Sequence, residues 1–594
     1  MRKKTHREII AGWHPYTPEE IDSYVAGGFW RNQTVGDLLD RNASIFPDKL
    51  AVADERTEVT WSQLKKNADR LALHLHKLGI GYGDFFVLQM ANVVEFYYLF
   101  FALNRLGAVP VMSLPRHRSK EIDHLLRLHE ARGICVMVGD KFDYAGMVDE
   151  MAGHHPYLEV KLACGGAAPA GWLGVDDLMA RKIENDYPAG FLKKLSPVPD
   201  DICCEQLSGG TTGVPKGIPR THNDYICMWE AYIGMVGFTD ESVCLVGIPV
   251  AHNAVFNTMA GPAIIKGGTI ILTRSPRPKE AFALIEKYKV TTVQLIPVQI
   301  TYWRDAAEER RQYDLSSLRV VSAGGQKVQP ELARWVLEDL GVNMCNHFGM
   351  SEGITIGNRW DSPDEPQMYT IGYPHIRDAA LQVKIVDEKN NPVRPGEMGE
   401  MAVKGPSHFK GYFRNPEQNA RSFDEEGFFH SGDLMSQRPD GRYVVEGRMG
   451  DVIKRAGENV YPEPVEALLL KHPKVVNAAV IGTPDERTGE KLCCFVQLKD
   501  SCRLTFEEVQ GYMKENGMAV FQWPERLELV KAWPLTAVNK IDKRSLRAFI
   551  AVGLFREGSI KKELGDDYLR RDKLTIDDIL SGRFKIEFTG APNN

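Results

Sequence analysis

Short apolar runs alternate with longer amphipathic stretches up to about residue 372 of the chain. The run DFFVLQM (84–90) precedes NVVEFYYLFFALNRLG (92–107), and GTIILT (268–273) precedes PKEAFALIEKYKVTTVQLIP (278–297). Each short run has the length and composition of a buried strand, and the stretch after it has the apolar repeat of a helix. Repeated alternation of this kind predicts an α/β fold, in which helices cover parallel sheets.

Beyond about residue 372, short and turn-rich strands follow one another, as in LQVKIVDEKNNPVRPGEMGEMAVKG and GRYVVEGR. They predict a smaller antiparallel or barrel-like unit. After Arg448 a compact α+β pattern begins, in which the helical stretches PEPVEALLLKH and FEEVQGYMKENG accompany the strands VVNAAVIG and KLCCFVQLK. The pattern thus changes twice along the chain, and each change marks a candidate boundary.

We therefore divide the chain into an N-terminal domain (1–447), a C-terminal domain (448–550) and an extension (551–594). The length alone predicts more than one domain, because single cores stop growing near ~250–300 residues. The extension is charged and rich in helix-forming residues (SIKKELGDDYLRRDKL). This composition fits either an ordered helix or a solvated tail.

Charge and composition narrow the classes of function. The 73 Lys and Arg residues nearly balance the 79 Asp and Glu residues, so we expect small ligands rather than nucleic acid or anionic lipid. The ten cysteines form no C-x-x-C pair, which argues against a zinc site or a disulfide framework. The basic N-terminus lacks the apolar core of a signal peptide, and the run FYYLFFAL is far shorter than the ~20 residues of a membrane span. We expect a cytoplasmic protein without a membrane span.

A polar, glycine-rich loop, LSGGTTGVPKGIPRTHNDY (207–225), is the first candidate for binding chemistry. Its glycines let successive backbone N–H groups face an anion, and its hydroxyl groups and lysine add donors. The members of this phosphate cradle are Ser208, Gly209, Gly210, Thr211, Thr212, Gly213 and Lys216. The loop is not a Walker A motif, because its lysine follows Pro215 and the Walker spacing is absent. Taken alone, it also fits a flexible surface turn.

Four further stretches carry candidate polar residues, each with an ordinary structural explanation when taken alone. HFGMSEG places Glu352 after a glycine turn, where a carboxylate can hold Mg²⁺. HSGDL places Asp433 where it can accept two hydrogen bonds from a ribose diol. GRMGDVIKRAGENVYP lies at a change of pattern and fits a hinge, and PLTAVNKID offers Lys540 near the end of the second unit.

The order and spacing of these five stretches resemble the adenylate-forming (ANL) superfamily of acyl-CoA synthetases, nonribosomal adenylation domains and luciferases, over about residues 30–550. GGTTGVPKGIPRTHNDY, AHN (251–253) and FQWPERLELVKAWPLTAVNKIDK are more similar to the aryl acid ligases of siderophore pathways, the 2,3-dihydroxybenzoate-AMP and salicylate-AMP ligases. The resemblance implies a large N-terminal domain, made of two α/β subdomains and a β-barrel, and a small mobile α+β C-terminal domain.

The resemblance also implies a role for each candidate residue. Lys540, Glu352 and Lys216 would act in catalysis, with Glu352 as the Mg²⁺ ligand. Beyond the phosphate cradle, the implied nucleotide contacts are Gly325, Phe348, Gly349, Ser351, Asp433, Arg448 and Lys540. The implied contacts of the acid are His252, Asn253, Thr258, Gly324 and Gly325. Asp451 would be the hinge, and Gly457 would line the tunnel for the thiol acceptor.

The implied reaction brings a carboxylate against the α-phosphate of ATP, and pyrophosphate leaves. Because both reactants are anions, positioning and neutralisation by cations carry most of the catalysis. Lys540 is suited to bridge the carboxylate and the α-phosphate, while Mg²⁺ and Lys216 offset the charge of the leaving group. The acyl-adenylate then meets a thiol after the small domain rotates and withdraws Lys540.

Several positions depart from the pattern of the aryl acid ligases. Ala254 stands where tyrosine is expected and Thr258 where serine is usual, so we expect a wider or differently shaped acid pocket. Asn539 replaces the glycine that normally precedes Lys540, and its side chain can alter how the lysine is presented. Ser351 in place of threonine or alanine is a mild change.

Three functions stay open. The first is activation of an aryl acid, such as 2,3-dihydroxybenzoate or salicylate, followed by transfer to the phosphopantetheine of a carrier protein. The second uses coenzyme A instead, with benzoate-like or alicyclic acids, and the segment GENVYP favours it. The third is a non-catalytic nucleotide-binding protein, against which the joint presence of Lys216, Glu352, Asp433 and Lys540 argues. ATP and Mg²⁺, with phosphopantetheine or coenzyme A, are the expected cofactors.

Overall fold

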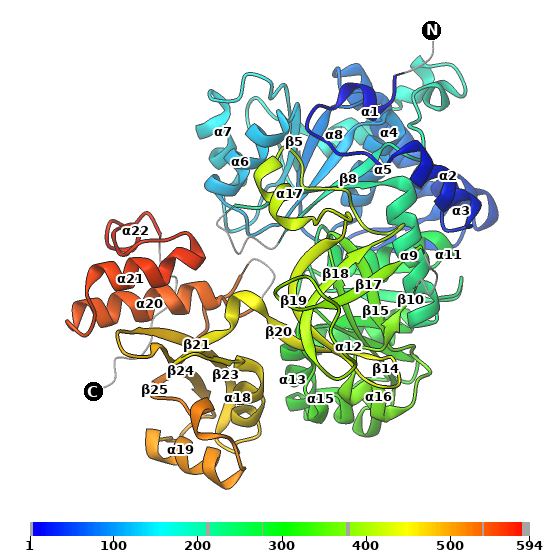
Figure 1. Ribbon diagram of the computed structural model, residues 1–594. Coiled ribbons are helices and arrows are strands. Elements are labelled where there is room, and N and C mark those ends of the chain that lie inside the picture. The colour runs from blue at the N-terminus through cyan, green and yellow to red at the C-terminus, as the bar shows by residue number, and fades with distance from the viewer. Residues whose placement is uncertain (1–3, 209–213, 276, 376–379, 537–539, 585–594) are drawn as a thin grey trace.

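The computed structural model describes residues 4–208, 214–275, 277–375, 380–536 and 540–584 (Figure 1). Two large, mostly parallel sheets with flanking helices make up most of the chain, which confirms the predicted α/β class. A four-stranded antiparallel sheet follows them, and a five-stranded sheet with helices ends the chain. The order of these units along the chain is the order that the sequence predicts.

The seven-stranded sheet has the order β7-β6-β5-β3-β4-β8-β9, and its last pair is antiparallel. Its strands are β3 (Phe85–Gln89), β4 (Val109–Ser113), β5 (Gly133–Met137), β6 (Val160–Cys164), β7 (Leu173–Gly174), β8 (Ile202–Leu207) and β9 (Gly217–Thr221). The helices before and among them are α1 (His6–Ile9), α2 (Pro18–Ala26), α3 (Val35–Ile45), α4 (Trp61–Lys77), α5 (Val94–Leu106), α6 (Ser119–His129), α7 (Tyr144–Ala152) and α8 (Val175–Ala180).

Helix α5 shows how the sequence pattern becomes structure. All of its residues are buried, because it packs between α3 and α4 on one side and β4 on the other. Most of its residues are apolar and they occupy every side of the helix, so no polar face is left for solvent and this packing is what the composition requires. Gly107 ends the helix with a φ of +66°, a conformation that glycine adopts without strain.

The nine-stranded sheet has the order β16-β15-β14-β13-β12-β10-β11-β1-β2. Its strands are β1 (Leu50–Ala53), β2 (Glu58–Thr60), β10 (Val243–Val246), β11 (Thr269–Leu272), β12 (Thr292–Leu295), β13 (Val320–Ala323), β14 (Asn343–Met350), β15 (Gly353–Gly357) and β16 (Tyr373–Pro374). Its helices are α9 (His222–Val236), α10 (Asn253–Val255), α11 (Gly261–Lys266), α12 (Pro278–Tyr288), α13 (Pro297–Asp305), α14 (Ala307–Arg310), α15 (Pro330–Arg334) and α16 (Asp364–Tyr369). A π-helical turn over Phe256–Ala260 joins α10 to α11.

The predicted antiparallel or barrel-like unit is a sheet of four antiparallel strands. They are β17 (Gln382–Val386), β18 (Met398–Lys404), β19 (Phe429–Gln437) and β20 (Tyr443–Arg448), and α17 (Pro416–Ser422) lies between β18 and β19 in the chain. Apolar residues of these strands share one core with Ile218, Ile354 and Ile356. The antiparallel sheet is therefore packed against the ends of both larger sheets.

The C-terminal unit has β24 (Gly489–Leu498) at its centre, paired with β23 (Val475–Asp485), β21 (Ile453–Arg455) and β25 (Arg526–Leu529). The strand β22 (Glu458–Val460) and the helices α18 (Pro462–Leu470) and α19 (Phe506–Glu515) complete it. This is the predicted α+β pattern. Figure 1 shows the unit, in yellow to red, beside the larger units.

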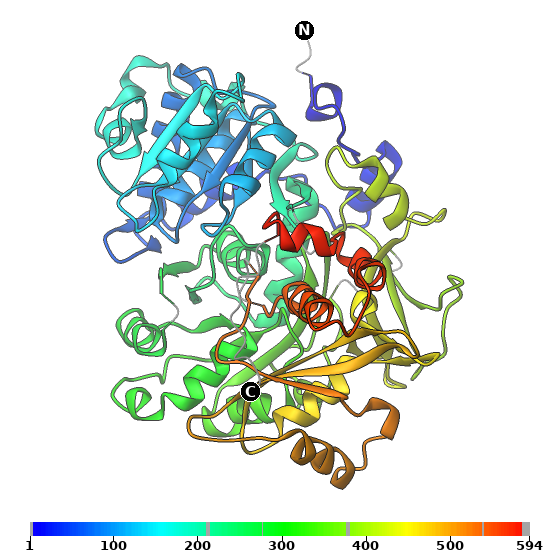
Figure 2. The same ribbon diagram turned by 90° about the vertical axis from the view of Figure 1, so that its left-hand side faces the viewer.

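The described part of the extension, residues 551–584, is folded into helices, as the first of its two sequence interpretations expects. Helix α20 (Lys543–Arg556) passes residue 550 without a break, and α21 (Lys562–Leu569) and α22 (Ile576–Leu580) follow it (Figure 2). The three helices share a core that includes Ala548, Ala551 and Leu569. No helix within the described ranges is long and apolar enough to cross a membrane.

Candidate active site

The base of the phosphate loop is closed by two reciprocal hydrogen bonds. The backbone N–H of Ser208 donates to the carbonyl of Lys216 at 3.0 Å, and the backbone N–H of Lys216 donates to Oγ of Ser208, also at 3.0 Å. These bonds extend the β8–β9 pairing and hold the two ends of the loop together. The cradle residues 209–213 lie outside the described residues, so their predicted role stays a prediction.

Lys216 and Glu352 are brought together through Tyr412, which sequence reasoning missed. Nζ of Lys216 lies 3.9 Å from the centre of the Tyr412 ring, and the Tyr412 hydroxyl donates to Oε1 of Glu352 at 2.8 Å. Burial lowers the pKa of Lys216, Glu352 raises it, and Lys573 and Arg448 lower it further. The cation and the carboxylate predicted from separate motifs thus lie in one site.

A buried arginine fixes the turn that carries Glu352. Arg220 donates to the carbonyls of Ser351 and Ser407, each at 2.9 Å, and pairs with Asp224 at 2.8 Å. Its side chain is 0% exposed, so these partners replace all the water that the guanidinium would otherwise bind. Arg220 and Asp224 are four residues apart, across the junction of β9 and α9, and no motif in the sequence singled them out.

The same turn depends on Gly353. Its φ is +130°, and a Cβ on this residue would lie 2.3 Å from the carbonyl oxygen of Ser407. A larger residue would therefore displace either the turn or the loop beneath it. Phe348 and Gly349 precede the turn on β14, where Phe348 packs against the core of the antiparallel sheet.

Asp433 and Arg448 face each other on neighbouring strands, β19 and β20. Nε of Arg448 donates to Oδ1 of Asp433 at 2.8 Å. Burial raises the pKa of Asp433, while Arg448 and Lys540 lower it. The carboxylate is thus a buried acceptor, paired with Arg448 and close enough to Lys540 to interact electrostatically.

Lys540 comes from the C-terminal unit and reaches this same region. Its Cε lies 3.8 Å from where a Cβ on Gly325 would stand. Burial lowers the pKa of Lys540 to about 8, and Arg448 adds to this effect while Asp433 opposes it. The backbone N–H of Lys540 donates to Oγ1 of Thr536 at 3.2 Å, which holds the lysine on its loop. The neighbouring Asn539 lies outside the described residues.

The residues predicted to contact the acid include His252, Asn253 and Thr258. Burial, with a contribution from Lys540, lowers the pKa of His252 to about 4. Oδ1 of Asn253 accepts a hydrogen bond from the Tyr225 hydroxyl at 2.8 Å. Thr258 lies in the π-helical turn, is 1% exposed, and its hydroxyl has no partner within the described part of the chain. His252 and Lys540 are therefore close enough to interact electrostatically, and Thr258 is more deeply buried than His252.

Gly324 and Gly325 directly follow β13. A Cβ on Gly324 would lie 2.7 Å from Nε2 and from the carbonyl oxygen of His347, so the chain passes too close to β14 for any side chain. Gly325 has a φ of +83°, which favours glycine for a second reason. Gly324 is buried, whereas Gly325 is exposed and leaves its backbone accessible next to Lys540.

Asp451, the predicted hinge, is held by cations from α20. Arg547 donates to Oδ1 of Asp451 at 3.0 Å, and Nζ of Lys543 lies 3.9 Å from Oδ2. Burial raises the pKa of Asp451, but Lys543 and Arg547 outweigh it and the pKa is lowered. Gly457 lies in the tight turn between β21 and β22 with open space around its Cα. Its predicted tunnel role stays a prediction.

The residues present fit a single Mg²⁺ ion. Oε1 of Glu352 is taken by Tyr412, and Oε2 has no hydrogen-bond donor within the described ranges. No group of three or more His, Cys, Asp and Glu side chains capable of holding a metal occurs among the described residues. Mg²⁺ often binds through one carboxylate, with phosphate oxygens and water as its other ligands. Glu352 offers such a carboxylate.

Two family models match the chain: AMP-binding enzyme over residues 39–413 and AMP-binding enzyme C-terminal domain over residues 464–540. The chain therefore belongs to the AMP-binding enzyme family, and its relatives are adenylate-forming ligases, as the sequence motifs predict.

Among curated proteins, the 2,3-dihydroxybenzoate-AMP ligase of Bacillus subtilis (strain 168) is 37% identical over 549 residues, which are 91% of this chain and 98% of that protein. The salicyl-AMP ligase / salicyl-S-ArCP synthetase of Mycobacterium tuberculosis is 37% identical over 90% of this chain and 94% of its own length. Among solved structures, the anthranilate CoA ligase AuaEII in complex with anthranoyl-AMP matches with a TM-score of 0.80 and 25% identity, covering 88% of this chain and 98% of that one.

Proposed function

We propose that this protein activates an aryl carboxylic acid with ATP, forming an acyl-adenylate and pyrophosphate, and then passes the acyl group to the phosphopantetheine thiol of a carrier protein. The relatives named for 2,3-dihydroxybenzoate and salicylate support an acid with an ortho hydroxyl group. The cofactors of this proposal are ATP, Mg²⁺ and the acceptor thiol.

One observation carries the proposal. Lys540, on the C-terminal unit, lies next to Gly325 and electrostatically close to Asp433 and His252, which belong to the N-terminal unit. A cation in this position lies between the side that would hold the ribose and the side that would hold the acid. That is where a carboxylate and the α-phosphate must meet.

The reaction then follows from charge. An acid carboxylate oxygen attacks the α-phosphorus, and the bond from phosphorus to the oxygen of the β-phosphate breaks, so that pyrophosphate leaves with the bonding electrons. Lys540 draws the two reacting anions together, and Asp433 accepts hydrogen bonds from the ribose. Lys216 neutralises the departing phosphates. Mg²⁺ on Glu352 would supply further neutralisation of the phosphate charge. No side chain of the protein has to act as a nucleophile.

Coenzyme A is the alternative acceptor of the acyl group. The segment GENVYP (457–462) and the likeness to an anthranilate CoA ligase both favour coenzyme A. This alternative leaves the first step and its residues unchanged. Release of AMP that depends on coenzyme A and needs no carrier protein would support it.

ATP–pyrophosphate exchange across a panel of acids tests the proposal. The panel contains 2,3-dihydroxybenzoate, salicylate, benzoate, 3-hydroxybenzoate, a heteroaromatic acid, an alicyclic acid and a medium-chain fatty acid. Exchange confined to the ortho-hydroxylated acids is the expected result. Strong exchange with benzoate or the alicyclic acid would favour the coenzyme A alternative. Absence of exchange with every acid would refute the proposed adenylate-forming activity.

A further inference from the structure

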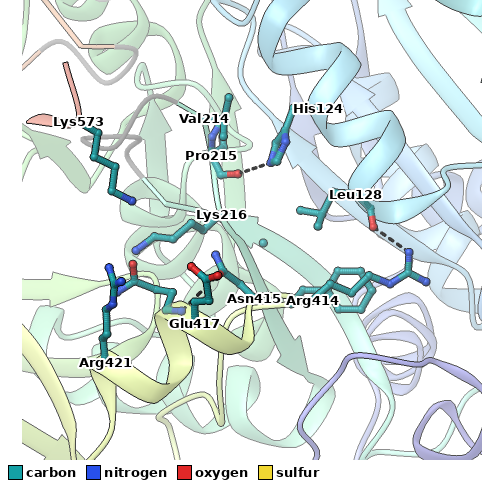
Figure 3. Close-up of a pocket in the computed structure, with 13 residues that line it drawn as sticks. His124, Leu128, Val214, Pro215, Lys216, Arg414, Asn415, Glu417, Arg421 and Lys573 are labelled. Atoms are coloured by element: carbon teal, nitrogen blue, oxygen red, sulfur yellow. Dashed lines mark hydrogen bonds between the residues drawn. The ribbon is translucent and has the colours of Figure 1, made fainter. Parts of the chain in front are cut away.

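A cavity of about 340 Å³ opens behind the phosphate loop, between the C-terminal extension and the N-terminal unit. Its lining comes from α6, from the residues that follow the loop, from α17 and the residues before it, and from Lys573 between α21 and α22 (Figure 3). The ends of the Lys216, Arg421 and Lys573 side chains are directed toward the same space in this view. Three elements far apart in the sequence thus each contribute one cation.

These three cations have no acidic partner within 4.0 Å in the part of the chain that the structure describes. The other charged groups of the lining change its net positive charge little. Arg414 is already paired with Glu130, and His124 is held by the carbonyl of Pro215 while burial lowers its pKa. Glu417 supplies one carboxylate, so the cavity keeps an excess of positive charge.

Lys573 is held in place by its neighbours although its own side chain is exposed. Asp572 before it accepts two hydrogen bonds from Arg547, each at 2.7 Å, and Leu574 after it is buried in the core of the extension. Lys573 itself has a φ of +55°, so its backbone turns sharply at this point. The loop therefore presents the lysine to the cavity rather than leaving it on a solvated tail.

Like charges that face one cavity repel each other, and an anion with several negative charges would remove this repulsion. Lys216 belongs both to this cavity and to the group around Tyr412 and Glu352. A ligand that reaches from the α-phosphate position past Lys216 enters the cavity with its terminal phosphates. The chemistry that fits is a pyrophosphate group.

We propose that Lys573, together with Lys216 and Arg421, forms a binding site for the pyrophosphate end of ATP and for pyrophosphate as it leaves, an inference that rests on the proposed function. Lys573 is a contribution of the extension, and it reaches the site from the same C-terminal unit as Lys540. The extension thus takes part in substrate binding as well as in the packing of its own unit.

The test compares Lys573→Gln with Lys562→Gln, a matched loss of one positive charge on the same extension, where Lys562 pairs with Asp577 instead. Titration calorimetry in the presence of Mg²⁺ measures the affinities for ATP, for pyrophosphate and for AMP. Lys573→Gln is expected to weaken the binding of ATP and of pyrophosphate by about tenfold, the order of one charge-assisted hydrogen bond. The affinity for AMP is expected to stay unchanged. Lys562→Gln is expected to bind all three as the wild type does.

Arg421→Gln should reproduce the same pattern, and Lys573→Arg should restore most of the affinity. Equal losses for ATP, pyrophosphate and AMP would overturn the inference, because they indicate a general distortion, and so would wild-type affinities in Lys573→Gln. Failure of the proposed function would look different. The exchange assay would then be silent for every acid, while the binding of pyrophosphate would still depend on Lys573.

Discussion

Replacing Asp572 by asparagine removes the charge that holds the extension to α20 while keeping the shape of the side chain. Arg547 donates two hydrogen bonds to Asp572, both at 2.7 Å, and the two side chains are 9% and 5% exposed. Removing one partner of such a buried pair lowers the free energy of unfolding by roughly 3–5 kcal/mol. Arg547 keeps Asp451 at 3.0 Å, so we expect the low end, about 3 kcal/mol.

The matched control is Asp577→Asn in the same extension. Asp577 pairs with Lys562, and these side chains are 58% and 40% exposed. An exposed pair contributes about 1 kcal/mol or less. The two substitutions therefore remove the same charge from one short segment, and burial is the main difference between them.

Hydrogen exchange of the amides in α20 and α21 measures the effect where it arises, since a chain of several units need not unfold in one step. A loss of about 3 kcal/mol corresponds to roughly hundredfold faster exchange, against about fivefold or less for the control. Similar exchange rates in Asp572→Asn and Asp577→Asn would refute the reasoning, because the buried pair would then contribute no more than the exposed one.

Four further results are expected. Lys540→Ala should abolish adenylate formation and leave thioester formation from preformed adenylate largely intact; equal losses would contradict its role. In the wild type, kcat/KM for adenylation should fall as pH rises through about 8, because Lys540 loses its proton there; a flat profile would count against a charged Lys540. Asn253→Ala should reduce ATP–pyrophosphate exchange with salicylate more than with benzoate. Arg220→Met should lower both the melting temperature and the rate of ATP–pyrophosphate exchange, because the turn at Glu352 would be displaced.

The strands and helices of the large units could be predicted because their patterns are local. The run at β3 and the mostly apolar helix α5 have lengths and compositions that fit few alternatives. The extension could not be decided in this way. Its order depends on partners far away in the sequence, such as the bond from the Tyr568 hydroxyl to the Gly482 carbonyl and the ion pair of Arg571 with Glu490.

The residues of the candidate site likewise fall into two groups, those that local motifs predict and those that only tertiary packing identifies. Lys216, Glu352, Asp433 and Lys540 lie in motifs with recognisable spacing, and the structure brings these four into one region. Tyr412 has no motif around it, and its meaning comes from packing between a cation and a carboxylate. The family roles assigned to individual residues, and the domain boundaries at 447 and 550, stay predictions.

Helix α20 crosses the point where the family resemblance ends, and this has a consequence for recombination between relatives. A C-terminal unit that stops at the equivalent of residue 550 would divide α20 and leave its apolar residues, such as Ala548 and Ile550, without part of their cover. It would also lack Asp572, and with it the anchor of Arg547. In this protein the portion that can be exchanged as a whole therefore includes the three helices α20, α21 and α22.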